Sequence, residues 1–271
     1  MAAIPQRLNV TSVSPQTPAE TRKAVVLDLD GTLLTGRKEV TPRTLEAVRV
    51  CLAENHLVVI ATARPLRTIV HLLPSDLLEC YVVLCNGARI VLKGECVHRN
   101  ELPGGEVGRV VDAVTACGLS PAIEADDHLY MDPEPDHVPF CDYSSLASYQ
   151  GIPACKVLGF SRRPVSASLI SDALPAGLNC VVTDGGTLAQ IARTGCSKAT
   201  ACRIVFEAER IDPARTYAFG DDTNDLSLFG AVRYGIAMAN AVPELKAVAY
   251  AVTESNDADG VARGIEEYVL Q

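Results

Sequence analysis

The stretch KAVVLDLDGTLL, from Lys23 to Leu34, places two carboxylates at the end of an otherwise apolar segment. Residues two apart in a strand share a face, so Asp28 and Asp30 could point the same way near the strand end. Two buried carboxylates repel each other and cost several kcal/mol unless they are compensated, and a divalent cation is the simplest compensation. The alternative is an Asx turn in which both side chains cap the end of the strand.

Several other short apolar runs also end in polar residues. HLVVIATAR reaches Thr62, YVVLCNGA reaches Asn86 and TYAFGDDTND reaches Asp221. Continuous apolar runs of this length are typical of strands buried on both faces of a parallel sheet, and helical patterns lie between them. This alternation predicts an α/β fold with a doubly wound parallel sheet, in which ligands bind at the carboxyl ends of the strands.

Residues 88–191 have a different pattern. EVGRVVDAVTACG is typical of a helix, whereas PAIEA, HLYMD and KVLGF are typical of short strands. NCVVTDGGTLAQIA predicts a hairpin that turns at Asp184-Gly185-Gly186. The predicted division is a flexible N-terminal tail at 1–22, a core at 23–87 and 192–271, and an inserted α+β domain at 88–191.

The composition limits the classes of partner. The chain of 271 residues carries a net charge of -9, which argues against binding to the phosphate backbone of a nucleic acid polymer. It contains no uncharged apolar run long enough to span a membrane. Its ten cysteines form no Cys-x-x-Cys pair and lie in apolar runs, so we expect reduced thiols and a cytoplasmic location. None of these patterns indicates an oligomeric state.

GDDTND, from Gly220 to Asp225, is a second cluster of carboxylates. Mg²⁺ prefers oxygen ligands and commonly takes one or two carboxylates, so this cluster predicts a magnesium site. The alternative is helix capping by Asp221 or Asp222, which is common before a helical segment such as LSLFGA. Capping uses one acid, and three acids in five residues exceed that need.

Lys198 follows Ser197, a predicted N-cap, and so falls in the first turn of a helix over KATACRIVFEAE. A cation there opposes the helix dipole, and a local rule broken in this way often marks a functional site. A solvated surface lysine is the alternative. Thr62, Arg64 and Asn86 offer donors around the same sheet edge, although a turn role explains each of them when it is taken alone.

Five sets of motifs, taken in this order, resemble the haloacid dehalogenase (HAD) superfamily. They are DLDGTLL, ATAR, NGA, SKATA and GDDTND…MANA…VTESNDADGVA. The resemblance extends over residues 23–271 and is strongest to the Cof-type phosphatases with a type IIB cap, whose cap lies where the insert is predicted. Two positions depart from the usual pattern, because Ala63 and Ala199 stand where glycine is frequent. Both residues are small, so we expect a slightly altered turn and no lost functional group.

The resemblance implies a role for each matching residue. Asp28 would be the nucleophile that forms an aspartyl-phosphate, and Asp30 would be the general acid and then the general base. The other implied roles are phosphate binding by Thr62, Lys198 and Asn224, a Mg²⁺ site of Asp28, the Asp30 carbonyl and Asp221, support of the metal by Asp225 and Asp222, and substrate contacts by Asn86 and Arg64.

The resemblance therefore implies a Mg²⁺-dependent phosphomonoester hydrolase that acts on a small phosphorylated metabolite, with the insert as a lid. Sugar phosphates, nucleotide-related phosphates and phosphorylated flavin precursors are the implied substrate classes. Two alternatives stay open: phosphoryl transfer between positions of a sugar phosphate, as in the related phosphomannomutases, and a ligand-binding module without catalysis. His128 and His137 in the insert could form a second metal site, although an exposed loop is the simpler interpretation.

Overall fold

The computed structural model describes residues 21–132 and 142–271, so His137 and almost all of the predicted tail lie outside the described residues. The chain divides into two compact units. The first comprises the chain up to Ala63 together with Ile69–His98 and Ser197–Gln271, and the second comprises Arg64–Thr68 and Arg99–Cys196. Each unit is built around its own sheet.

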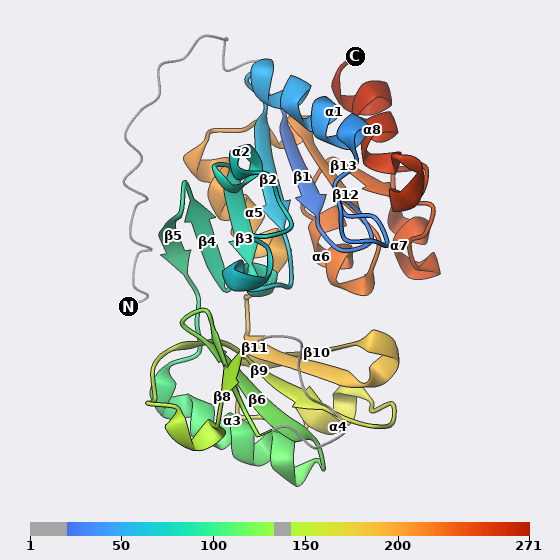
Figure 1. The fold of residues 1–271 in the computed structure, drawn as a ribbon. Helices are drawn as coiled ribbons and strands as arrows, with labels where there is room; N and C mark the ends of the chain where they lie inside the picture. The colour runs from blue at the N-terminus through green and yellow to red at the C-terminus, as the bar shows by residue number, and fades with distance from the viewer. Residues whose placement is uncertain (1–20, 133–141) are drawn as a thin grey trace. The chain divides into compact units, whose positions relative to one another are not determined.

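Eight of the described strands form the sheet of the first unit, in the order β14-β13-β12-β1-β2-β3-β4-β5 (Figure 1). The pairs from β14 to β3 are parallel, and β4 is antiparallel to β3. Every residue of β1, β2, β3 and β12 is buried, which explains their largely apolar sequences. The strands are β1 (Ala24–Asp28), β2 (Leu57–Ala61), β3 (Tyr81–Leu84), β4 (Arg89–Leu92), β5 (Glu95–Arg99), β12 (Thr216–Gly220), β13 (Tyr234–Ala237) and β14 (Ala251–Val252).

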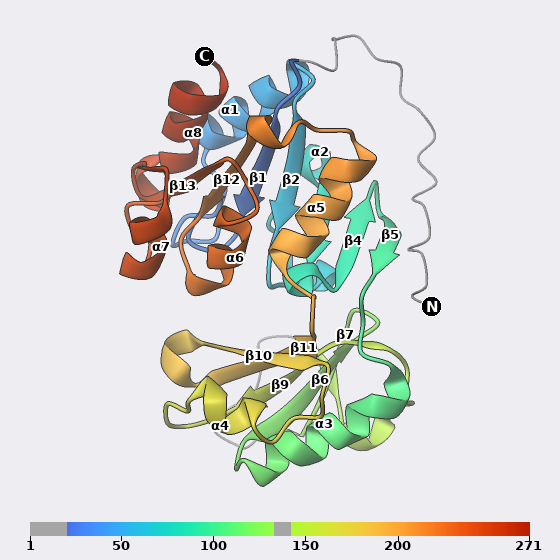
Figure 2. The same ribbon diagram turned by 180° about the vertical axis from the view of Figure 1, so that it is seen from behind.

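Helices cover both faces of this sheet. Figures 1 and 2 show α1 and α8 on one face and α5 and α6 on the other. α1 begins at Pro42, and the hydroxyl of Thr41 accepts a hydrogen bond from the Thr44 amide, as the sequence predicts for a cap. The predicted doubly wound α/β fold is therefore confirmed. The helices are α1 (Pro42–Ala53), α2 (Ser75–Leu78), α5 (Lys198–Ala208), α6 (Leu226–Phe229), α7 (Pro243–Val248) and α8 (Gly260–Gly264).

The second unit holds a six-stranded sheet in the order β10-β11-β9-β6-β7-β8. β10 and β11 form the predicted hairpin, in which Thr183 pairs with Leu188 across the turn Asp184–Gly186. α3 packs on β6 and β9, and α4 packs on β10, with an apolar core between these helices and the sheet. The elements are α3 (Gly104–Ala116), β6 (Ser120–Ala125), β7 (His128–Met131), β8 (Tyr143–Ser144), β9 (Ala154–Phe160), α4 (Ala167–Ser171), β10 (Leu178–Thr183) and β11 (Leu188–Arg193).

The strands β4 and β5 lie inside 88–191, the range that the sequence pattern assigns to the insert. In the structure β4 pairs with β3, for example Val91 with Val82, so this hairpin extends the sheet of the first unit. The second unit accordingly resumes at Arg99 and ends at Cys196, later than the predicted limits. A short hairpin has the same sequence pattern in either sheet, so the pattern alone does not say which sheet it joins.

Among the described residues, no helix is long and apolar enough to cross a lipid bilayer.

Short turns complete the described elements. The turns are the 3₁₀ segments η1 (Leu66–Thr68), η2 (Cys85–Gly87), η3 (Leu146–Ser148), η4 (Asp184–Gly186), η5 (Pro213–Arg215), η6 (Thr223–Asp225) and η7 (Asn256–Ala258), and the π-helical segment η8 (Ile265–Val269).

Candidate active site

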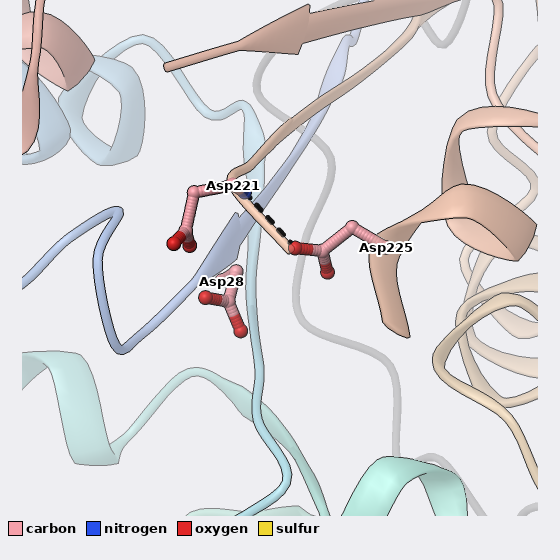
Figure 3. Close-up of side chains that lie close together, drawn as sticks. All are labelled: Asp28, Asp221 and Asp225. Atoms are coloured by element: carbon pink, nitrogen blue, oxygen red, sulfur yellow. Dashed lines mark hydrogen bonds between the residues drawn. The ribbon is translucent and has the colours of Figure 1, made fainter. Parts of the chain in front are cut away.

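Three aspartates meet at the carboxyl ends of the parallel strands. Asp28 is the last residue of β1, and Leu27 pairs with Phe219 of β12, so Asp221 follows β12 at the same edge. Asp225 ends the η6 turn that comes next. One carboxylate oxygen from each aspartate lies within 4.8 Å of the others, and Figure 3 shows the three side chains converging. The two carboxylate clusters of the sequence thus contribute to one site.

Lys198 is the buried cation of this site. It lies in the first turn of α5, where the predicted N-cap Ser197 accepts a hydrogen bond from the Thr200 amide. Its Nζ donates to Asp28 Oδ1 and, at 2.7 Å, to Asp225 Oδ1. Burial alone would lower the pKa of Lys198, but the Asp225 and Asp28 carboxylates more than offset this and hold that pKa above its usual value. Lys198 is therefore charged, and it is not a solvated surface lysine.

Both oxygens of Asp225 already have protein donors. Oδ1 accepts from Lys198, and Oδ2 accepts from the backbone N–H groups of Asp221 at 3.1 Å and Asp222 at 3.3 Å, the first of which is the dashed line in Figure 3. Gly220 permits this approach, because a Cβ at that position would lie 2.6 Å from Asp225 Cγ. Asp225 therefore orients the lysine and the backbone of the Asp221 loop, which leaves Asp28 and Asp221 as the carboxylates better placed to bind a metal.

The surroundings of Asp28 and Asp221 disfavour the charged forms of both carboxyl groups. Burial raises the pKa of Asp28 well above its usual value, against the opposing effect of Lys198. Burial also raises the pKa of Asp221 to about 6, although the hydroxyl of Thr32 donates to Asp221 Oδ1 at 2.9 Å and opposes the shift. Two neighbouring carboxylates whose charged forms are disfavoured by their surroundings fit a hard divalent cation such as Mg²⁺, which takes oxygen ligands.

The turn after β1 allows this close approach of Asp221. Gly31 has a φ of +78°, in the left-handed region that favours glycine, and a Cβ there would lie 2.2 Å from Asp221 Oδ2. Thr32, the next residue, is buried and supplies the hydroxyl that binds the same carboxylate. The Asp-Gly-Thr sequence therefore needs its glycine for the backbone conformation and for space.

Thr62, Asn86 and Asn224 are linked at the same sheet edge. Asp28 pairs with Ala61 of β2, so the buried Thr62 lies one residue beyond that register. The Asn86 amide donates to the Thr62 carbonyl at 2.9 Å, and Asn224 Nδ2 donates to Asn86 Oδ1 at 3.5 Å. These contacts connect the loops after β2, β3 and β12.

Three predicted site residues lie outside the cluster of three carboxylates. The Asp30 carboxylate forms an ion pair with Lys38 Nζ at 2.7 Å and is not one of the three clustered carboxylates. Asp222 Oδ1 accepts from the Thr223 amide at 2.7 Å as the N-cap of η6, so its side chain has the capping role that was the alternative to metal support. Arg64 belongs to the second unit, whereas the other predicted residues belong to the first.

Other contacts were not predicted. The pairing of Lys38 with Asp30 has no signal in the sequence beyond a basic residue in the following loop. The MANA and NDADG motifs contribute Asn240 and Asn256, which donate to the backbone near Asp30, and these motifs were a usable signal without an assigned role. In the second unit, His128 Nε2 lies 2.9 Å from Ser144 Oγ and belongs to no metal-ligating group among the described residues.

Comparisons with known proteins identify relatives of this chain. The model of the haloacid dehalogenase-like hydrolase family matches residues 25–265. The protein YxeH of Bacillus subtilis (strain 168) is 28% identical over 272 residues, which cover 92% of this chain and 98% of YxeH. YitU of the same organism, a 5-amino-6-(5-phospho-D-ribitylamino)uracil phosphatase, is 26% identical over 265 residues, which cover 90% of this chain and 96% of YitU.

The fold also matches solved structures. A sugar phosphatase of HAD subclass IIB superposes with a TM-score of 0.76 at 22% identity, over 91% of this chain and 98% of that one. That likeness concerns the fold, whereas the family model spans nearly the whole described core and insert. The chain therefore belongs to the haloacid dehalogenase-like hydrolase family.

Proposed function

We propose that the chain is a Mg²⁺-dependent phosphomonoesterase that transfers the phosphoryl group of a small metabolite first to Asp28 and then to water. The chain is an enzyme of the phosphoric monoester hydrolase class, as its family and its phosphatase relatives indicate. The observation that carries the finer proposal is the buried arrangement in which Lys198 bridges Asp28 and Asp225 beside Asp221.

Asp28 is the proposed nucleophile. It lies at the carboxyl end of the central strand β1, where α/β sheets bind their ligands. One of its oxygens accepts from Lys198, which holds the carboxylate in place for in-line attack on phosphorus. Attack by a carboxylate splits the hydrolysis into two easier steps, because the aspartyl-phosphate formed first is then cleaved by water.

Asp30 is the proposed general acid and base. In the first step the bond from Asp28 to phosphorus forms and the bond to the leaving oxygen breaks, while the Asp30 carboxyl group gives its proton to that oxygen. In the second step the oxygen of a water forms a bond to phosphorus and the bond from phosphorus to Asp28 breaks, while Asp30 takes the proton from that water. The Asp30 carboxylate is partly exposed, which suits the exchange of a proton with a bound substrate. Proton transfer of this kind contributes typically ~10²–10⁴-fold to the rate.

Asp28 and Asp221 would hold Mg²⁺. Asp225 would support this site indirectly, because its carboxylate accepts a hydrogen bond from the Asp221 backbone N–H. When bound, Mg²⁺ would neutralise charge on the phosphoryl oxygens and lessen the repulsion between two anions. Lys198 adds a second positive charge at the same place. Thr62 and Asn224 would donate to the phosphoryl oxygens, while Asn86 and Arg64 would contact the rest of the substrate.

The proposed substrate is a small phosphorylated metabolite. The relative YitU acts on a phosphorylated ribitylaminouracil, and a protein of the same fold is a sugar phosphatase. The net charge of -9 disfavours a polyanionic substrate such as a nucleic acid. Sugar phosphates, nucleotide-related phosphates and phosphorylated flavin precursors are therefore the classes to test.

Phosphate release from such a panel, with Mg²⁺ or with EDTA, tests the proposal. We expect metal-dependent release that Asp28→Asn abolishes. Asp76→Asn is the matched control, because Asp76 is a surface carboxylate that pairs with Arg49 at 2.7 Å, and it should leave release unchanged. Formation of isomerised sugar phosphate without free phosphate would contradict the proposal and indicate a mutase. Phosphate release that survives Asp28→Asn would contradict the assignment of Asp28 as the nucleophile.

A further inference from the structure

The loop between Asp30 and α1, residues 31–41, is anchored at its start by the buried Leu33 and Leu34 and exposed further along. Its backbone returns to β1 through the Leu33 amide, which donates to the Asp28 carbonyl, and the Leu34 amide, which donates to the Leu29 carbonyl. The tip at 36–39 is exposed. A loop of this kind is expected to move more than the strand that carries it.

Four polar side chains from the C-terminal part of the chain bind this loop. We call Asn240, Asn256, Asp257 and Asp259 the C-terminal clamp. Asn240 Nδ2 donates to the Gly31 carbonyl at 2.8 Å, directly after Asp30. Asn256 Nδ2 donates to the Leu34 carbonyl at 2.8 Å. The two asparagines are themselves joined, because the Asn256 amide donates to Asn240 Oδ1 at 3.0 Å. Both ends of the Asn240 side-chain amide therefore have a partner, which fixes its orientation.

The other two members of the clamp are aspartates. The Gly36 amide at the loop tip donates to Asp257 Oδ1 at 2.8 Å. At the far end of the loop the Thr41 hydroxyl donates to Asp259 Oδ1 at 2.5 Å, while it also accepts from Thr44 as the N-cap of α1. The clamp residues are Asn240, Asn256, Asp257 and Asp259, and their contacts extend along the loop from its first residue to its last.

We propose that the C-terminal clamp is a positioning element that holds the loop so that Asp30 can transfer its proton. The inference rests on the proposed function, since it needs Asp30 to be the general acid. A general acid must lie within about 2.6–3.2 Å of the oxygen that it protonates, and a misplacement of about 1 Å can cost ~10²-fold in rate. The partner of Asp30, Lys38, lies in the same loop, so the clamp also fixes the group that pairs with the acid.

The test is the ratio of kcat/KM for an alkyl phosphate to kcat/KM for a nitrophenyl phosphate. An alkoxide needs a proton as it leaves, whereas nitrophenolate leaves well without one. kcat/KM reports the steps up to the phosphoryl-enzyme, so the ratio isolates protonation of the leaving group. Asp30→Asn sets the lower limit of this ratio, and we expect Asn240→Leu and Asp257→Leu to lower it about tenfold.

Two controls separate positioning from general damage. Asp257→Asn keeps an oxygen that accepts from Gly36 and should restore the ratio of the parent enzyme. Thr253→Val removes a 2.8 Å hydrogen bond to the Gly260 carbonyl, which lies within the C-terminal part of the chain and outside residues 31–41, so it should also leave the ratio unchanged. Thermal unfolding of each variant tests whether it is folded. If Asn240→Leu does not fold, Asp257→Leu alone tests the inference.

The outcomes are distinct. A lower ratio in the clamp variants, with recovery in Asp257→Asn, supports the inference. If Asp30→Asn lowers the ratio while the clamp variants lower both values of kcat/KM equally, or neither, the clamp is merely structural and the inference is overturned. If Asp30→Asn leaves the ratio unchanged, the role proposed for Asp30 fails, and the clamp inference fails with it.

Discussion

Lys198 and Asp225 form a fully buried ion pair, with 2.7 Å between Nζ and Oδ1. The same ammonium group also donates to Asp28, so one cation serves two carboxylates that have left water. Burying charge is costly unless each group is paired and hydrogen-bonded. This relationship couples the stability of the core to the arrangement of the site.

Removing the lysine should therefore destabilise the protein as well as inactivate it. Lys198→Met leaves Asp28 and Asp225 buried without their cation, and breaking a buried pair in this way costs about 3–5 kcal/mol. Urea unfolding measures this change. Lys246→Met is the control, because the Lys246 ammonium group donates to the Ala239 carbonyl in an exposed hydrogen bond, and it should cost less than about 1 kcal/mol. Equal stability of the two variants would contradict the assignment of a charged, buried Lys198.

Mg²⁺ should stabilise the folded protein through Asp28 and Asp221. A ligand that binds only the folded state at 100 times its Kd adds about 2.7 kcal/mol, so Mg²⁺ should raise Tm and EDTA should reverse the rise. Asp221→Asn should remove most of this response. Asp222→Asn should keep it, because the Asp222 carboxylate caps η6 and lies outside the cluster. An equal response in Asp221→Asn and the parent protein would place the metal elsewhere.

Gly31 and Gly94 provide a matched pair for the effect of close approach. Both have a φ of +78°, but a Cβ at Gly31 would lie 2.2 Å from Asp221 Oδ2, whereas a Cβ at Gly94 would have no atom within 4 Å. Both Gly→Ala variants should lose about 1 kcal/mol or more of stability from backbone strain. Gly31→Ala should in addition displace Asp221 and abolish phosphate release, while Gly94→Ala stays active. An active Gly31→Ala would show that the position of Asp221 tolerates the displacement.

His56 should make stability depend on pH. Burial lowers the pKa of His56 from 6.5, and the nearby Lys23 lowers it further. At this histidine the folded state then binds fewer protons than the unfolded state. The contribution of His56 to stability is therefore complete above pH 6.5 and is lost as the pH falls through that value towards the folded-state pKa. His56→Gln should make the slope of unfolding free energy shallower between about pH 7 and pH 5.

The acidic positions of the site could be predicted because parallel strands bring their carboxyl ends to one edge. The sequence therefore implies that Asp28 and Asp221 meet, once β1 and β12 are recognised as strands. Ser197, as a residue type that favours the N-cap position, likewise predicts the helix that has Lys198 in its first turn. In each case a local pattern and one topological rule are sufficient.

Other features depend on loop conformation, which local patterns do not encode. Lys38 reaches Asp30 from a position with a φ of 63°, and nothing in the residue type indicates that conformation. Spacing alone does not distinguish Asp222, which caps a turn, from Asp225, which binds Lys198, since both follow the same strand. The two roles differ because the backbone conformation of η6 directs the two side chains to different partners.

The central claim is that Asp28 accepts the phosphoryl group. The most direct test is an acid quench during turnover of a ³²P-labelled substrate, followed by peptide mapping of the label. We predict label on the peptide that contains Asp28 and none in Asp28→Asn, with the folded state of the variant verified by its thermal unfolding. Label on a peptide without Asp28, or turnover in Asp28→Asn at the parent rate, would contradict the account.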